Sequence, residues 1–60
     1  MSEAEQMTAQ FPGAADLMGA LDAAGLQSDQ DWALETTTWA FSDGSKIAIS
    51  GSDVTVKAAA

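Results

Sequence analysis

The sequence contains no cysteine, no histidine and no arginine. Without cysteine, disulfide bonds and thiolate metal sites are excluded. Without histidine, a transition-metal site would have only carboxylate ligands, which suit hard ions better. The most frequent general base of enzymes is also missing. We therefore expect no metal, no cofactor and no enzymatic activity.

Long apolar runs are absent as well. No run approaches the roughly 20 residues that a membrane-spanning helix requires. The first residues, MSEAEQ, lack the basic and apolar regions of a signal peptide. We expect a cytoplasmic location and no membrane partner.

Positive charge is scarce. Nine carboxylates face two lysines, which gives a formal net charge of −7. Such a surface repels nucleic acid, because phosphate binding needs lysine and arginine to displace counterions, so we expect no direct nucleic-acid binding. The same field attracts a basic protein surface. The alternative is that the charge only keeps a small protein in solution.

The length of 60 residues allows one domain, spanning residues 1–60. Residues 1–10 are mostly polar with isolated apolar positions. They form either a frayed lead-in or a weak first turn of helix, and we expect little order there. The three alanines at 58–60 are either native or a remnant of a cloned tag.

The segment 12–25 has the pattern of an amphipathic helix. Pro12 suits the first turn of a helix, where its missing N–H is not needed. Gly25 suits the left-handed residue that ends a helix, with Leu26 folding back onto it. Apolar residues follow the helical spacing i, i+3, i+4, i+7. They are Ala14, Leu17, Met18, Leu21 and Ala24.

The segment 28–41 leaves two alternatives. SDQD at 28–31 has helix-start chemistry and permits a single helical turn over 29–33. Alternatively the chain enters a strand at Trp32. Threonines and aromatics favour strands, and we expect one over 34–41. Trp32 and Leu34 have the wrong parity for the core face of that strand, which predicts a bulge among the threonines or a bend before them.

Two turns fix the register of the remaining sheet. A three-residue loop over 42–44, with Gly44 left-handed, sets Phe41 opposite Ser45, Trp39 opposite Ile47 and Thr37 opposite Ile49. A type II′ turn at Gly51-Ser52 sets Ser50 opposite Asp53, Ile49 opposite Val54 and Ile47 opposite Val56. Both turns place the apolar side chains on one face.

The predicted fold class is α+β, with an N-terminal amphipathic helix packed on a three-stranded antiparallel β-meander over 34–58. The core face of the sheet holds Trp39, Phe41, Ile47, Ile49, Val54 and Val56. The solvated or lightly covered face holds Thr38, Ala40, Lys46, Ala48, Thr55 and Lys57.

The residues that could form a catalytic, phosphate-binding or calcium-binding motif do not have the spacing that these motifs require. Asp16 and Asp22 are six positions apart on one helix, about 9 Å of axial rise, too far for an acid pair. Gly44 and Gly51 lie in hairpin turns and do not precede a helix N-terminus that would bind phosphate. Neither DGS at 43–45 nor SDQD at 28–31 completes a calcium loop.

One stretch combines an aromatic with several acids. Trp32 lies beside Asp29, Asp31 and Glu35, and tryptophan is enriched at binding hot spots. The alternative is that Trp32 covers the end of the core. We take Trp32 as the candidate aromatic anchor and the acids as the candidate protein-binding surface. This acidic set is Asp16, Asp22, Asp29, Asp31, Glu35, Asp43 and Asp53.

A very small, cysteine-free, Ala- and Asp-rich acidic chain with a helix followed by a β-meander resembles the anti-CRISPR proteins of phages and mobile elements. Those directed at type I-C systems are the most similar. The resemblance spans the whole chain and rests on size, acidity and element order, so no motif residue is transferred. It implies a bacterial host cell and inhibition of the Cascade surveillance complex by DNA mimicry. The target would be the basic surface of a Cas subunit that reads the protospacer-adjacent motif.

A rival hypothesis comes from a different class: a small structural or regulatory interaction module, monomeric or a weak homodimer, whose acidity serves solubility. The exposed edges of a β-meander would support self-pairing. Charge geometry discriminates the two, because a DNA mimic must gather its acids on one surface.

Overall fold

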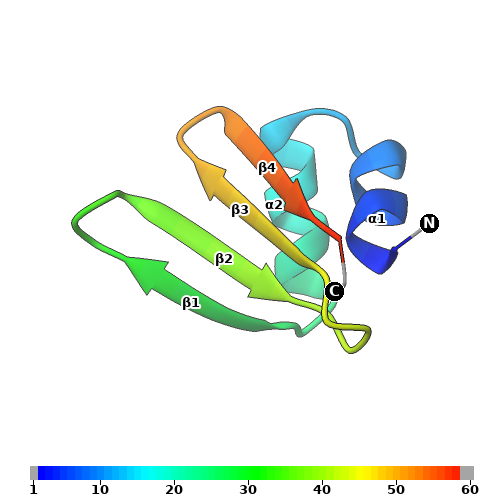
Figure 1. Cartoon of the computed structure of the whole chain (residues 1–60). Coiled ribbons are helices and arrows are strands. Elements are labelled where there is room, and N and C mark those ends of the chain that lie inside the picture. The colour runs from blue at the N-terminus through cyan, green and yellow to red at the C-terminus, as the bar shows by residue number, and fades with distance from the viewer. Residues whose placement is uncertain (1, 59–60) are drawn as a thin grey trace.

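The computed structural model of the chain describes residues 2–58. Over this range the chain forms two helices and a four-stranded antiparallel sheet, and Figure 1 shows both helices on the same side of the sheet. The elements are α1 (Glu3–Gln10), α2 (Ala14–Ala23), β1 (Gln27–Asp31), β2 (Thr36–Ala40), β3 (Lys46–Ser50) and β4 (Asp53–Lys57). The α+β class is confirmed, whereas the predicted counts of one helix and three strands are wrong. Of the alanine tail, Ala59 and Ala60 lie outside the described residues.

The hairpin between β2 and β3 has the predicted register. Trp39 lies opposite Ile47, and the Phe41 N–H donates to the Ser45 carbonyl at 2.9 Å. Gly44 has a φ of 90°, the left-handed conformation that closes such a three-residue loop. Turn chemistry therefore set this register correctly.

The hairpin between β3 and β4 is confirmed as well. Ser50 lies opposite Asp53 and Ile49 opposite Val54. Gly51 has a φ of 61°, and Glu35 is the sole non-glycine residue of the described part with a positive φ. Ser52 therefore has the negative φ that distinguishes a type II′ turn from a type I′ turn.

The core lies between the helices and the inner face of the sheet. Its buried residues are Ala4, Leu17, Leu21, Trp39, Phe41, Ile47 and Ile49. Val54 and Val56 belong to the predicted inner face but are only partly buried, because β4 is an edge strand. On α2 the apolar stripe is narrower than predicted: Met18 is 38% exposed and Ala24 is exposed.

The boundaries of α2 follow its flanking residues. Gly13 is the N-cap, so Pro12 precedes the helix and does not occupy its first turn as predicted. Gly25 has a φ of 68° and ends the helix as expected. Leu26 then packs against the core. These contacts set the point at which the chain turns towards β1.

Helix α1 occupies most of the segment for which the sequence predicted little order. Ser2 and Glu5 form a capping box, in which the Glu5 N–H donates to the Ser2 hydroxyl and the Ser2 N–H donates to the Glu5 carboxylate. Ala4 is buried, and Met7 and Phe11 pack against the core. A local cap and a short apolar stripe thus stabilise a helix that is weak on composition alone.

The loop between β2 and β3 also holds the N-terminus of α1. The Glu3 N–H donates to Asp43 Oδ2 at 2.8 Å, and the Ala4 N–H donates to the buried Ser45 hydroxyl at 3.1 Å. That hydroxyl in turn donates to Asp43 Oδ1. Together with the Ser2 cap, these bonds satisfy the free N–H groups of the first helical turn.

Strand β1 and the loop that follows it are the main difference from the prediction. Asp31 pairs with Thr36 across a loop formed by residues 32–35. Asp31 Oδ1 accepts hydrogen bonds from the N–H groups of Ala33 and Leu34, at 3.0 and 3.3 Å. The predicted strand over 34–41 is present but begins at Thr36, while a helical turn over 29–33 and a strand beginning at Trp32 are wrong. Where a bulge or a bend was predicted, the chain reverses direction in a four-residue loop.

Candidate functional site

The face of the sheet that the helices leave uncovered is named here the bare face. Antiparallel pairing arranges its side chains in three rows that run across the four strands. The basic row holds Gln27, Ala40, Lys46 and Lys57. The middle row holds Asp29, Thr38, Ala48 and Thr55. The acidic row holds Asp31, Thr36, Ser50 and Asp53. The predicted assignment of residues 38, 40, 46, 48, 55 and 57 to this face is confirmed.

Four of the predicted acids gather at the end of the sheet where the β1–β2 and β3–β4 loops lie. We call this set, Asp29, Asp31, Glu35 and Asp53, the acidic end. Asp29 and Asp31 are two residues apart on one face of β1, about 6.6 Å. Asp31 and Asp53 share a row three strand spacings apart, about 14 Å. None of the four has an ion-pair partner among residues 2–58.

The loop at the acidic end carries two exposed apolar side chains. Trp32 is 79% exposed and Leu34 is 68% exposed. The alternative that Trp32 covers the end of the core is therefore wrong. The loop between β1 and β2 lies away from both helices (Figure 1). Leu34 was not among the predicted site residues, although its parity had already excluded it from the core face of the sheet.

The other three predicted acids lie elsewhere. Asp43 is in the β2–β3 loop at the opposite end of the sheet, where it holds the N-terminus of α1. Asp16 and Asp22 are exposed on α2, in the helical layer behind the sheet. The predicted acidic set is thus one group of four and three separate residues, of which Asp43 has a structural role.

Hydrogen bonds lower the pKa of two carboxyl groups. The Glu3 N–H, followed by the hydroxyl and N–H of Ser45, lowers the pKa of Asp43 below its ordinary value. The hydroxyl and N–H of Ser2 lower the pKa of Glu5 in the same way. Both groups stabilise helix α1, and neither belongs to the acidic end.

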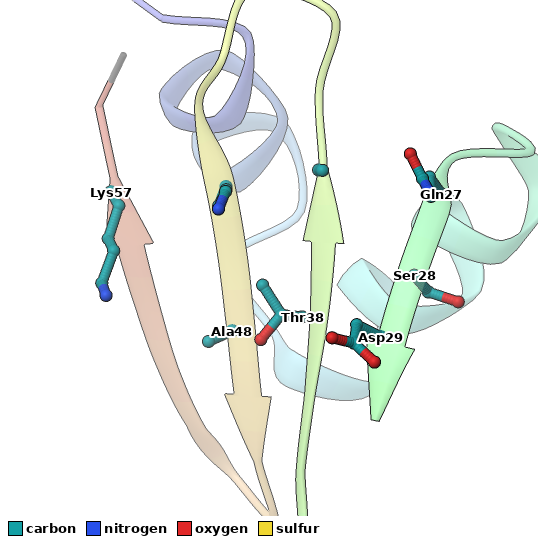
Figure 2. Close-up of a pocket in the computed structure, with 8 residues that line it drawn as sticks. Gln27, Ser28, Asp29, Thr38, Ala48 and Lys57 are labelled. Carbon is teal, nitrogen blue, oxygen red and sulfur yellow. The ribbon is translucent and has the colours of Figure 1, made fainter. Parts of the chain in front are cut away.

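A shallow hollow of about 500 Å³ lies on the bare face. It is lined from β1 by Gln27, Ser28 and Asp29, and its floor is formed by small side chains such as Thr38 and Ala48 (Figure 2). Lys46 and Lys57 border it on the β3 and β4 side. Carboxylate and ammonium groups therefore line opposite sides of one open surface.

In the part of the chain that the structure describes, no group of three or more histidine, cysteine, aspartate or glutamate residues is placed to hold a metal ion. Neither helix within residues 2–58 has the length and apolarity needed to cross a membrane.

Comparison with known proteins finds no match to this chain, neither among family models nor among curated proteins or solved structures.

Proposed function

We propose that this chain is a small protein-binding module that docks its acidic end, with Trp32 and Leu34, onto a basic protein surface that otherwise binds DNA. The observation that carries the proposal is the gathering of four acids and two exposed apolar side chains at one end of the sheet. Among residues 2–58 both lysines lie away from this end, in the basic row.

The charge density of the acidic end is similar to that of one side of a DNA duplex. B-DNA carries one charge per about 1.7 Å of axis, so a 14 Å segment carries roughly eight charges, of which a protein on one side meets about half. The acidic end places four carboxylates over a similar length. A surface of lysines and arginines that accepts phosphates is therefore its complement.

The exposed apolar side chains of Trp32 and Leu34 supply binding energy that exposed ion pairs alone do not provide. Exposed ion pairs contribute about 0.2–1 kcal/mol each, whereas a buried tryptophan at an interface centre contributes about 2 kcal/mol or more. We therefore expect Trp32 to enter an apolar pocket on the partner, with the acids of β1 contacting the basic rim of that pocket. Charge then guides the encounter and Trp32 sustains the complex.

The resemblance to anti-CRISPR proteins names the target to test first, the DNA-recognition surface of a type I Cascade complex in a bacterial cell. The test is a pull-down and a gel shift with purified type I-C Cascade and target duplex at two salt concentrations. The proposal expects binding that blocks the duplex and weakens with salt.

The Trp32→Ala variant belongs in the same assay, with Met18→Ala on α2 as the matched control because Met18 is also exposed. We expect the Trp32 variant to bind about 30-fold more weakly, the equivalent of about 2 kcal/mol. We expect the Met18 variant to bind like the wild type. Equal binding by the three proteins would contradict a role for Trp32, and absence of binding by the wild type would remove this target.

A further inference from the structure

The two lysines of the chain occupy an unusual position. Lys46 and Lys57 lie directly opposite one another on β3 and β4, both on the bare face. Like charges in directly opposed positions destabilise a sheet. Within residues 2–58 neither lysine side chain forms an ion pair or a hydrogen bond. The chain therefore holds its positive charges together, at the end of the face opposite the acidic row.

We propose that the bare face binds a second copy of itself. In this dimer the two sheets pack face to face about a two-fold axis that lies in the interface and runs perpendicular to the strands. Such an axis places the basic row of each copy over the acidic row of the other, in an isologous contact. Lys57 then faces Asp53 of the second copy, and Lys46 faces its Ser50. The inference rests on the register of the rows alone and does not depend on the proposed function.

The middle row suits the same arrangement. Under this axis the middle row of one copy lies over the middle row of the other. Thr38, Ala48 and Thr55 are small and uncharged, so they allow the two sheets to approach. Asp29, the charged member of the row, faces Asp29 of the second copy. This like-charge pair weakens the dimer, although both carboxylates are on edge strand β1, where solvent screens them.

The size of the face determines how tight the dimer is. Four strands of five residues give a footprint of about 19 by 17 Å, so a dimer covers roughly 650 Å² in total. Stable specific interfaces cover about 1,200–2,000 Å². Each copy also carries a net charge of −7, which opposes association. The dimer is therefore weak, and because it covers the acidic row it competes with any basic partner that binds there.

Charge reversal tests this arrangement. One variant is Lys46→Glu/Lys57→Glu, which makes the basic row acidic. The other is Ser50→Lys/Asp53→Lys, which makes the acidic row basic and keeps Asp31, whose carboxylate holds the β1–β2 loop. Sedimentation equilibrium of each variant and of their equimolar mixture gives the association constants, and far-UV circular dichroism checks the fold.

We expect the wild type to dimerise with a dissociation constant on the order of 0.1–1 mM. Each variant alone should associate at least tenfold more weakly. Their mixture should form a heterodimer at least as tight as the wild-type dimer. As a control, Asp16→Lys/Asp22→Lys raises the net charge by four on α2, against three for the Ser50→Lys/Asp53→Lys variant, and should not bind the Lys46→Glu/Lys57→Glu variant.

Two outcomes of the sedimentation experiments would overturn the proposal. One is a wild type that stays monomeric up to about 1 mM. The other is a mixture of folded charge-reversed variants that associates no better than the mixture with the α2 control. Amide chemical shifts of the wild type, followed on dilution, locate the contact: changes confined to the helices would also contradict a bare-face dimer.

Discussion

The Ser45→Ala substitution tests how the β2–β3 loop stabilises the N-terminal helix. The Ser45 hydroxyl is fully buried and accepts the Ala4 N–H at 3.1 Å, and Ala4 is also fully buried. Alanine at position 45 leaves this backbone N–H without a partner. A buried donor that loses its acceptor costs about 1–3 kcal/mol.

That loss is large for a domain of this size. A chain of 60 residues has a free energy of unfolding of about 3–9 kcal/mol. In so small a domain each kcal/mol shifts the melting temperature by about 4–8 °C. We therefore expect thermal unfolding of Ser45→Ala, followed by circular dichroism, about 5–20 °C below that of the wild type. Hydrogen exchange of the Ala4 amide should also accelerate.

Ser42→Ala is the matched control. Ser42 is exposed, and its hydroxyl contacts the Glu3 carboxylate at 3.3 Å. We expect this variant to melt within a few degrees of the wild type, because exposed hydrogen bonds contribute little net stability. If both serine variants melt at the wild-type temperature and the Ala4 amide exchanges at an unchanged rate, the loop does not hold the helix.

Three further predictions concern stability and exposure. Glu35 has a φ of 53°. Because a left-handed residue with a side chain costs about 1–2 kcal/mol, Glu35→Gly should raise the melting temperature by several degrees. A fall in the melting temperature would contradict this prediction. Because hydrogen bonds lower the folded-state pKa of Asp43, the contribution of Asp43 to stability is complete above about pH 4 and is lost as the pH falls further. The melting temperature of Asp43→Asn should therefore change less than that of the wild type between pH 6 and pH 2.5. An unchanged pH dependence would count against this role of Asp43. Acrylamide should quench the fluorescence of Trp39→Phe, which retains the exposed Trp32, more strongly than that of Trp32→Phe, which retains the buried Trp39; similar quenching would contradict the exposed position of Trp32.

The β2–β3–β4 sheet was predictable from the sequence because its register depends on short loops. Gly44 and Gly51 have the positive φ that their turns require, and the three-residue loop over 42–44 places Trp39 and Ile47 on the same face. The residues of the two loops were therefore sufficient to predict the register of these three strands.

Strand β1 was not predictable from the same signals. Its sequence, QSDQD, has no apolar residue and is exposed along its whole length. What stabilises it is backbone pairing with β2 and the hydrogen bonds that Asp31 makes to the following loop. Glutamate is also an unusual residue for the left-handed position at 35, so the loop carried no recognisable turn signature.

Helix α1 was missed although its capping box, Ser2 and Glu5, is local to residues 1–10. Its other stabilising contacts are distant. Two of its first N–H groups are satisfied by residues about 40 positions away, Asp43 and Ser45. No reading of residues 1–10 by themselves shows these partners. The same holds for the acidic end, since Asp53 joins the acids of β1 only through the pairing of all four strands.

The measurement that tests the central claim most directly compares two double variants with the same change in charge. Asp29→Asn/Asp31→Asn neutralises two of the four carboxylates of the acidic end and keeps an oxygen at position 31 for the loop. Asp16→Asn/Asp22→Asn neutralises α2. Both enter a gel-shift competition between the protein and target duplex for type I-C Cascade.

If the acidic end is the docking surface, the first variant inhibits about 2- to 30-fold more weakly than the wild type, as expected for two exposed ion pairs, and the second inhibits like the wild type. Equal inhibition by the two variants would contradict the account, because net charge and not its placement would then govern binding.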